Sequence, residues 1–146
     1  MELNSRNNQR SFSFNMQQAR FSVPIATSEQ FKAALLATRD WSGISPTQLR
    51  MLQMQCRAPE CKISALQIAE ALKLKSAGVA RLHYGNFARA IGERLGYVPP
   101  KGANGTPCWW FTLSTGRATA DDAKNAHGDW IMRPELVAAL RAMKWA

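Results

Sequence analysis

The sequence predicts a mainly helical chain with a small β-hairpin, on the basis of three observations. Residues 62–96 have apolar residues at helical spacing on both sides of a tight corner, Lys73-Leu74-Lys75-Ser76. A Trp-rich, strand-like stretch follows at residues 108–114, and a second one covers residues 129–132. Two helices around a corner form a helix-turn-helix. The hairpin after them makes the predicted fold a winged helix-turn-helix-like single domain.

Length and composition suit one domain. The chain has 146 residues, of which 46 % are hydrophobic, which is enough for one ordinary core. No apolar run is long enough to cross a membrane, and the N-terminus lacks the continuous apolar segment of a secretory signal. The three cysteines, an odd number, fit reduced thiols better than a disulfide framework. We therefore expect a cytoplasmic protein.

The net charge of +9 is unevenly distributed along the chain. Residues 62–117 contain eight Lys/Arg against two Glu, whereas residues 118–146 carry four charges of each sign. The positive excess therefore falls on the predicted helix-turn-helix, where a polyanion such as DNA would dock. A basic surface that serves only solubility is the alternative interpretation.

Two segments are predicted from the composition of the chain. Residues 1–24 are rich in Asn, Gln, Ser and Arg and poor in core-forming residues, which predicts a flexible basic N-terminal arm. The arm would follow phosphates or a minor groove, as homeodomain arms do, or it would be a leader without a role. Residues 25–146 would form the folded, winged-helix-like domain.

Three helices outside the helix-turn-helix follow from capping residues and apolar spacing. The first begins after Thr27-Ser28, with Ser28 as the N-cap candidate, and ends at a turn over residues 41–44. The second opens at Ser45-Pro46, with Ser at the N-cap and Pro at the first helical position, and breaks at Pro59. The last begins at Pro134. Their predicted buried residues are Phe31, Ala34, Leu35 and Ala37, then Leu49, Met51, Leu52 and Met54, then Leu136, Val137, Leu140 and Met143.

Within the helix-turn-helix, Ser64 is the candidate cap of the first helix, and residues 77–95 form the second. The predicted inward residues are Ile63, Leu66, Ile68, Ala69 and Leu72, then Val79, Leu82, Phe87, Ile91 and Leu95. Arg81, Gly85 and Arg89 lie four residues apart, on one stripe away from the apolar side. A glycine inside a helix costs about 1 kcal/mol relative to alanine. Gly85 would therefore allow the close approach either of a phosphodiester chain or of another helix.

The hairpin prediction rests on the tryptophans and on the polar loop between the strands. Trp109 and Trp110 would point to opposite faces of the strand 108–114, one into the core and one toward a partner. Trp41, Trp130 and Trp145 are expected to pack in the core or at its edge. The loop over residues 115–128 would be the wing.

The chain offers little for catalysis, so we expect no enzymatic activity and no cofactor. Its two histidines are His83 and His127, and it contains no HExxH, GxSxG or glycine-rich phosphate motif. Cys56, Cys61 and Cys108 with His127 would supply the ligands of a Cys3His zinc site. The CxxC spacing typical of structural zinc is absent, however, and buried free cysteines are the better interpretation. The acidic pair at residues 121–122 is more simply solvated than metal-bound.

The predicted site is an interface for double-stranded DNA, with helix 77–95 in the major groove. Arg81 and Asn86 are the candidates for base contacts, because Arg suits guanine and Asn suits adenine. Phosphate and backbone contacts would set the register. The candidates for these contacts are Lys73, Lys75, Ser76, His83, Arg89, Arg94 and Lys101, joined by Arg117 and Lys124 in the wing.

Four segments resemble a bacterial module that precedes HNH nuclease domains in restriction-type proteins: RMLQMQCRAPECKISALQIAEAL, LHYGNFARAIGERLGY, GTPCWWFTL and DWIMRPELVAAL. The similarity covers residues 30–146, and the second segment and the W-x-MRPEL tail are its most specific parts. The resemblance implies a DNA-reading, target-recognition role in defence against foreign DNA. The chain ends at Trp145-Ala146 without an HNH segment, so nuclease chemistry does not transfer to it. A shorter polar residue such as Asn is expected at the position of Arg81 in the module, so the target read here is expected to differ.

Two other functions remain open at this point. The first alternative is a small protein that binds a protein partner, as an inhibitor or adaptor of a defence system of phage or plasmid type. Alternatively, the chain would be the DNA-binding half of a nuclease whose catalytic domain lies on a separate chain. Binding that survives high salt would favour a protein partner, because phosphate contacts weaken steeply with salt.

Overall fold

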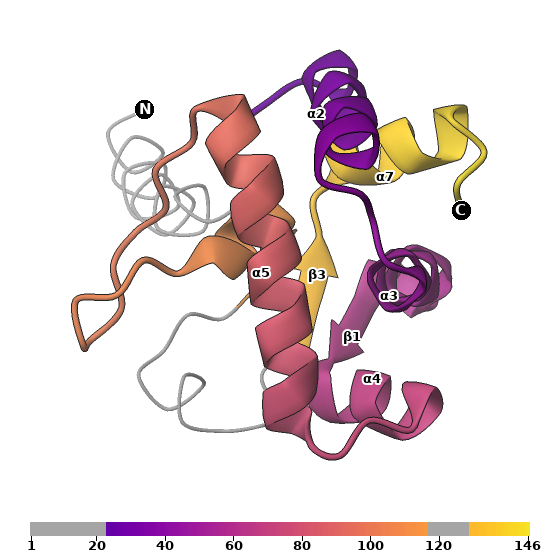
Figure 1. Ribbon diagram of the computed structural model, residues 1–146, viewed down its shortest axis with the longest axis vertical. Coiled ribbons are helices and arrows are strands. Elements are labelled where there is room, and N and C mark those ends of the chain that lie inside the picture. The colour runs from indigo at the N-terminus through magenta and orange to yellow at the C-terminus, as the bar shows by residue number, and fades with distance from the viewer. Residues whose placement is uncertain (1–22, 117–128) are drawn as a thin grey trace, which may run out of the picture.

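The computed structural model describes residues 23–116 and 129–146 (Figure 1). In chain order the elements are α2 (Ser28–Trp41), α3 (Pro46–Arg57), the 3-10 helix η1 (Pro59–Cys61), β1 (Lys62–Ser64), α4 (Ala65–Leu72), α5 (Ala77–Leu95), the 3-10 helix η2 (Trp109–Thr112), β2 (Ser114–Thr115), β3 (Asp129–Met132) and α7 (Pro134–Ala142). The mainly helical class is confirmed. None of these helices combines the length and apolar character needed to cross a bilayer.

Three helices begin with the same reciprocal cap. Thr27, Ser45 and Ser64 each accept a hydrogen bond from the main-chain N–H three residues later, and the glutamine there bonds back to the cap's own N–H. The predicted caps at Ser45 and Ser64 are confirmed. The prediction of Ser28 was wrong by one residue, because Thr27 satisfies the free amides and Ser28 is already helical.

The chain also forms a three-stranded antiparallel sheet with the order β1-β3-β2. β2 and β3 form the predicted hairpin, although β2 spans only Ser114–Thr115. β1 was not predicted, because Ile63 fits the helical spacing of the segment that follows. In the structure, Ile63 lies opposite Trp130 in the sheet, and the helix begins one residue after Ser64.

The prediction of a strand over residues 108–114 was wrong for most of that range. Trp109–Thr112 form a 3-10 turn, with Phe111 N–H bonded to Cys108 O and Leu113 N–H bonded to Trp110 O. The turn buries Phe111 and Leu113. Both tryptophans are half-buried, so they do not divide between a core face and a free face. Packing of the Trp109 ring against Gly92 of α5 overrides the local strand preference.

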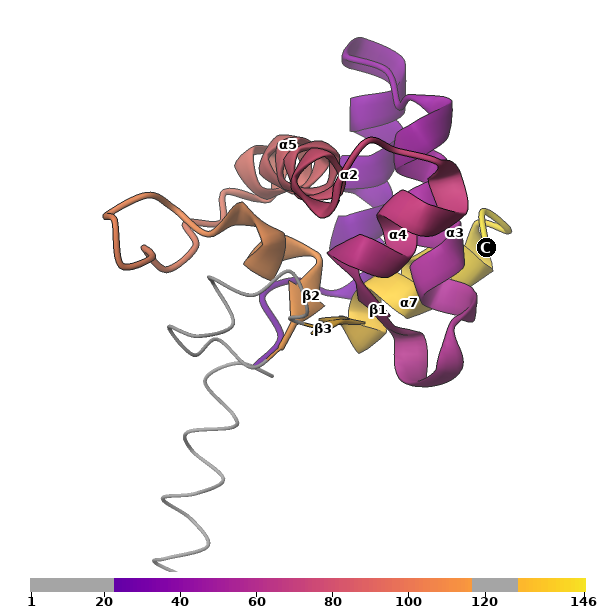
Figure 2. The ribbon, with the colours of Figure 1, turned by 90° about the horizontal axis from the view of Figure 1, so that it is seen from below.

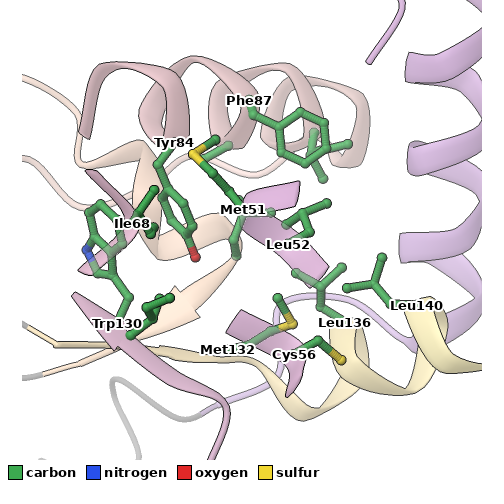
Figure 3. Packing of buried hydrophobic residues seen from close by; sticks show 14 of the residues in the cluster. Met51, Leu52, Cys56, Ile68, Tyr84, Phe87, Trp130, Met132, Leu136 and Leu140 are labelled. Atoms are coloured by element: carbon green, nitrogen blue, oxygen red, sulfur yellow. The ribbon is translucent and has the colours of Figure 1, made fainter. Parts of the chain in front are cut away.

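α5 lies over the sheet, with α4 beside its N-terminal half and α2 with α7 toward its other end (Figures 1 and 2). The core beneath α5 combines aromatic packing with a hydrogen-bond network. The Tyr84 ring stacks on Trp130 with 4.0 Å between centroids (Figure 3). The Tyr84 hydroxyl hydrogen-bonds Ser114 and donates to Gln55 Oε1 at 2.7 Å, and Gln55 Nε2 donates to Trp130 O at 3.1 Å. The network therefore joins α3, α5 and the sheet.

Several core predictions need correction. Leu82, expected inward, is 62 % exposed, and Tyr84 fills the core in that turn of α5. Trp41, expected to pack, is 83 % exposed, because it ends α2 beyond that helix's buried side. Trp130 is buried as predicted. The buried side of α3 contains Met51 and Leu52 as predicted, together with Gln55 and Cys56, whereas Leu49 and Met54 are half-buried.

Candidate nucleic-acid interface

α5 has two sides of different composition, and the boundaries predicted for it, 77–95, are confirmed. Successive residues of an α-helix are separated by about 100° of rotation. The inward side is buried against α2, α3, α4 and η2 and consists of Ala77, Ala80, Tyr84, Phe87, Ala88, Ile91 and Gly92. The opposite side, which we call the outward stripe, consists of Gly78, Arg81, Leu82, Gly85, Asn86 and Arg89.

The corner between α4 and α5 presents two lysines to solvent. Lys73 ends α4 in the left-handed region at φ 56°, which reverses the chain. Ser76 caps α5, and its Oγ accepts from Val79 N–H at 3.2 Å. Lys73 and Lys75 are both exposed and form no ion pair with any described residue. The corner therefore offers two unneutralised cations at the start of α5.

Arg81 and Asn86, the predicted base-reading residues, are both exposed on the outward stripe. Neither side chain is hydrogen-bonded or ion-paired within the described part of the chain. Arg89 lies on the same stripe but differs from Arg81. Its Nε is 2.8 Å from Glu93 Oε1, and its guanidinium is 5.9 Å from the centre of the Trp109 ring. The Arg89 charge is therefore partly neutralised before any partner arrives.

The other predicted contacts lie outside the stripe. His83 is half-buried and Arg94 exposed, and both are rotated about 100–120° around α5 from Leu82, on its flank. Lys101 is exposed in the loop after α5, where its main chain bridges to Pro107. Arg117 and Lys124 lie outside the described residues, as do residues 1–22 of the predicted arm and most of the predicted wing. The structure thus places Arg81, Asn86 and Arg89 on the outward stripe of α5, and Lys73, Lys75 and Ser76 in the corner that directly precedes this helix.

The three glycines of α5 have different surroundings. A Cβ at Gly92 would lie 2.8 Å from both Thr112 Oγ1 and the Trp109 ring, so close packing of α5 on η2 requires glycine there. A Cβ at Gly85 would meet nothing within 4 Å, and one at Gly78 would meet only Ser76 Oγ at 3.5 Å. The helix–helix explanation considered for Gly85 is therefore wrong. It applies instead to Gly92, which the sequence did not single out.

The base of the predicted wing is fixed beneath the first half of α5. Trp130, the second residue of β3, stacks on Tyr84. Gly116, directly after β2, has no room for a side chain, because a Cβ there would lie 2.7 Å from Asp129 O. Lys62 Nζ lies 3.5 Å from Asp129 Oδ2 across the β1–β3 pair.

Arg133 is a buried cation that sequence reasoning missed. Only 3 % of the residue is exposed, and its burial lowers the pKa of the guanidinium. Its Nε donates to Phe111 O at 2.8 Å and its Nη1 donates to Val23 O at 3.0 Å. It therefore joins Val23, which precedes α2, to η2. The only sequence signal for it was an arginine between two buried apolar positions, Met132 and Leu136.

The three cysteines are free thiols. Cys61 Sγ donates to Cys56 O at 3.4 Å, and burial raises the pKa of the Cys56 thiol. Cys108 lies against Gly102 in the loop after α5, far along the chain from Cys56 and Cys61. Within residues 23–116 and 129–146, no group of three or more His, Cys, Asp and Glu side chains is placed to hold a metal ion. His127 and the acidic pair at residues 121–122 lie outside the described residues.

Comparison of the chain with models of protein families, with curated proteins and with solved structures finds no match.

Proposed function

We propose that this protein binds double-stranded DNA without catalysing a reaction on it, and that α5 is the helix that enters the major groove. The arrangement of elements supports a winged helix-turn-helix. The order α3, β1, α4, α5, β2, β3, with β3 between β1 and β2, is the order and pairing of that fold. In a winged helix-turn-helix of this arrangement, the loop between β2 and β3 would be the wing and α5 would be the recognition helix.

The observation that chiefly supports the proposal is the outward stripe of α5. No described residue covers it, and it presents Arg81 and Asn86 five residues apart, at its two edges about 140° from each other. Arginine donates two hydrogen bonds to guanine O6 and N7, and asparagine pairs with adenine N6 and N7. The two glycines on the stripe leave the helix backbone open to the groove.

Cations around the stripe would bind phosphates and set the register. Between residues 62 and 101 the chain has seven Lys/Arg against two Glu. Two of the seven are ion-paired, Lys62 with Asp129 and Arg89 with Glu93. The remaining five are Lys73, Lys75, Arg81, Arg94 and Lys101. Arg89 would have to exchange Glu93 for a phosphate, so we expect it to contribute less than Lys73 or Lys75.

The remaining sequence predictions extend this proposal. Ser76 and His83 would add polar contacts to the backbone, and Arg117 and Lys124 would act from the wing together with the N-terminal arm. The resemblance to the module that precedes HNH nuclease domains favours target recognition in defence against foreign DNA. A nuclease chain or another defence component would then be the protein partner.

Fluorescence anisotropy with random-sequence duplex DNA over a salt series tests the proposal. We expect binding at low salt. The logarithm of the association constant should fall linearly with the logarithm of the salt concentration. In the double variant Lys73→Gln with Lys75→Gln, the slope should fall by about two units at most, because each lost phosphate contact removes about one.

The matched control is Arg39→Gln with Lys144→Gln, which removes the same charge near the C-terminus. Arg39 lies 6.0 Å from the Trp145 ring and is ion-paired with Asp40 at 2.9 Å, and its helix α2 and the C-terminus lie away from the α4–α5 corner (Figure 1). The control should keep the wild-type slope. No binding at low salt, or equal slopes for both double variants, would contradict the proposal.

A protein partner is the second candidate function, and Trp41 favours it. This side chain is 83 % exposed at the end of α2. A shallow groove begins at the next residue, Ser42, and runs between the α2–α3 turn and Phe87 and Ala90 of α5. Exposed tryptophans are frequent anchors of protein interfaces. Capture of a partner that resists high salt and is lost in Trp41→Ala would favour this function over DNA binding.

A further inference from the structure

Leu82 occupies a position that the fold does not explain. It is the large hydrophobic residue of α5 that is exposed, at 62 %, whereas Tyr84, Phe87 and Ile91 of the same helix are buried. It lies near the middle of the outward stripe, about 100° from Arg81 and 40° from Asn86. No described residue covers this stripe, so the folded chain gains little from a leucine here.

The residues around Leu82 leave its side chain prominent. Gly78 precedes it by four residues and Gly85 follows it by three, which makes both its neighbours on the helix surface. Neither glycine carries atoms that would shield the leucine methyl groups from a partner. The polar side chains closest to it on the stripe are Arg81 and Asn86, the two base-reading candidates.

We propose that Leu82 contacts the C5-methyl group of a pyrimidine, thymine or 5-methylcytosine, close to the base read by Asn86. This inference rests on the proposed function. The methyl group is the apolar feature that a base pair displays in the major groove, and apolar side chains recognise it by contact. A DNA phosphate or a hydrogen-bonding base edge would gain nothing from leucine at this position.

The helix geometry limits how far apart the two contacted bases are. Leu82 and Asn86 are separated by four residues, or about 6 Å of helix rise. Base pairs are stacked about 3.4 Å apart. A recognition helix lying along the groove would therefore place the methylated pyrimidine within about two base pairs of the adenine.

The test begins with sites selected from random duplex pools, one unmethylated and one with 5-methylcytosine in place of cytosine. Sites enriched from the first pool make thymine the candidate source of the methyl group, and sites enriched from the second pool alone make 5-methylcytosine the candidate. The selected duplex is then remade with each methylated pyrimidine replaced in turn by deoxyuridine or cytosine. Replacement at one position should weaken wild-type binding about three- to fivefold, which is the effect of losing one buried methyl group.

The variant Leu82→Ala should bind the methylated and unmethylated duplexes equally. Val98→Ala is the matched control, because Val98 is an exposed apolar residue outside α5, at 84 % exposure. It should keep the wild-type sensitivity. Duplex binding that is insensitive to every methyl replacement, or equally sensitive in Leu82→Ala, would overturn this inference while DNA binding stands. Absence of any salt-dependent duplex binding would overturn the proposed function and this inference together.

Discussion

The inward and outward sides of α5 belong to one helix but are built on different principles. The inward side packs Tyr84, Phe87 and Ile91 at 2 % exposure or less, and the Tyr84 hydroxyl is hydrogen-bonded within the core. The outward stripe has two glycines, an exposed leucine, Arg81 and Asn86 without a partner among the described residues, and Arg89 paired with Glu93. The inward side stabilises the fold, and the stripe contributes little to stability, so its residues are available for a partner. Substitutions on the two sides should therefore change different measured quantities.

Phe87→Ala and Asn86→Ala compare the two sides at adjacent positions. Phe87 is 2 % exposed, so its truncation should lower the free energy of unfolding by about 3–5 kcal/mol. Asn86→Ala should change it by less than about 0.5 kcal/mol, since surface substitutions rarely do more. Urea denaturation followed by circular dichroism measures both. Similar losses in the two variants would show that the outward stripe is structural.

Arg81→Ala tests the outward stripe through DNA affinity, whereas the previous pair of variants tests it through stability. Loss of a bidentate guanine contact should weaken binding to a selected site by about 1–3 kcal/mol while leaving non-specific binding nearly unchanged. The unfolding free energy should stay close to that of the wild type. An equal loss of affinity on every sequence would make Arg81 a phosphate contact.

Gly92→Ala and Gly85→Ala make the same substitution on opposite sides of the helix. Alanine is the better helix former by about 1 kcal/mol, so Gly85→Ala should raise the unfolding free energy by up to that amount. At Gly92 the added methyl group meets Trp109 and Thr112 at 2.8 Å. The resulting strain should lower the unfolding free energy by about 1–2 kcal/mol. Thermal denaturation should show a higher melting temperature for Gly85→Ala and a lower one for Gly92→Ala. Stabilisation by both variants would contradict the packing of α5 on η2. Weaker DNA binding by Gly85→Ala would support close approach of DNA to the stripe.

Tyr84→Phe should have a small effect on the free energy of unfolding, and this effect should depend on pH. Burial of Tyr84 raises the pKa of its phenol above the usual value of about 10, so the folded state holds the proton more tightly than the unfolded state. This contribution is complete below about pH 10 and is lost as the pH rises toward the folded-state pKa. At pH 7 the variant should lose about 1 kcal/mol, since Gln55 Oε1 loses its donor.

Between pH 9 and 11 the unfolding free energy should fall less steeply for Tyr84→Phe than for the wild type. Part of the decline should remain, because burial also raises the pKa of Tyr97. Urea denaturation at several pH values measures the two slopes. Equal slopes would mean that the Tyr84 phenol titrates as an exposed one.

The predictions that held were those set by local chemistry. Ser45-Pro46 and Ser64 begin helices because their hydroxyls satisfy free main-chain amides, an interaction contained within four residues. α5 runs from a capping serine to Gly96, which adopts φ 69° and ends it. The positions of Arg81 and Asn86 on one exposed side follow from helical periodicity alone.

Predictions failed where a segment's environment comes from distant residues. The aromatic run at residues 109–112 reads as a strand but forms a 3-10 turn, because it packs on Gly92 of α5. Ile63 fits a helical spacing but joins a strand, because β3 offers it main-chain partners.

The sequence by itself determined the mainly helical class, the caps at Ser45 and Ser64, and the basic, outward-facing composition of α5, since these depend on neighbours along the chain. The tertiary structure decided which of the apolar residues of α5 enter the core and which glycine is required by packing. It also decided that a buried arginine, Arg133, joins Val23 before α2 to Phe111 of η2. The reason is physical: burial and close contact are properties of surfaces that meet only after folding, and no local pattern encodes the partner.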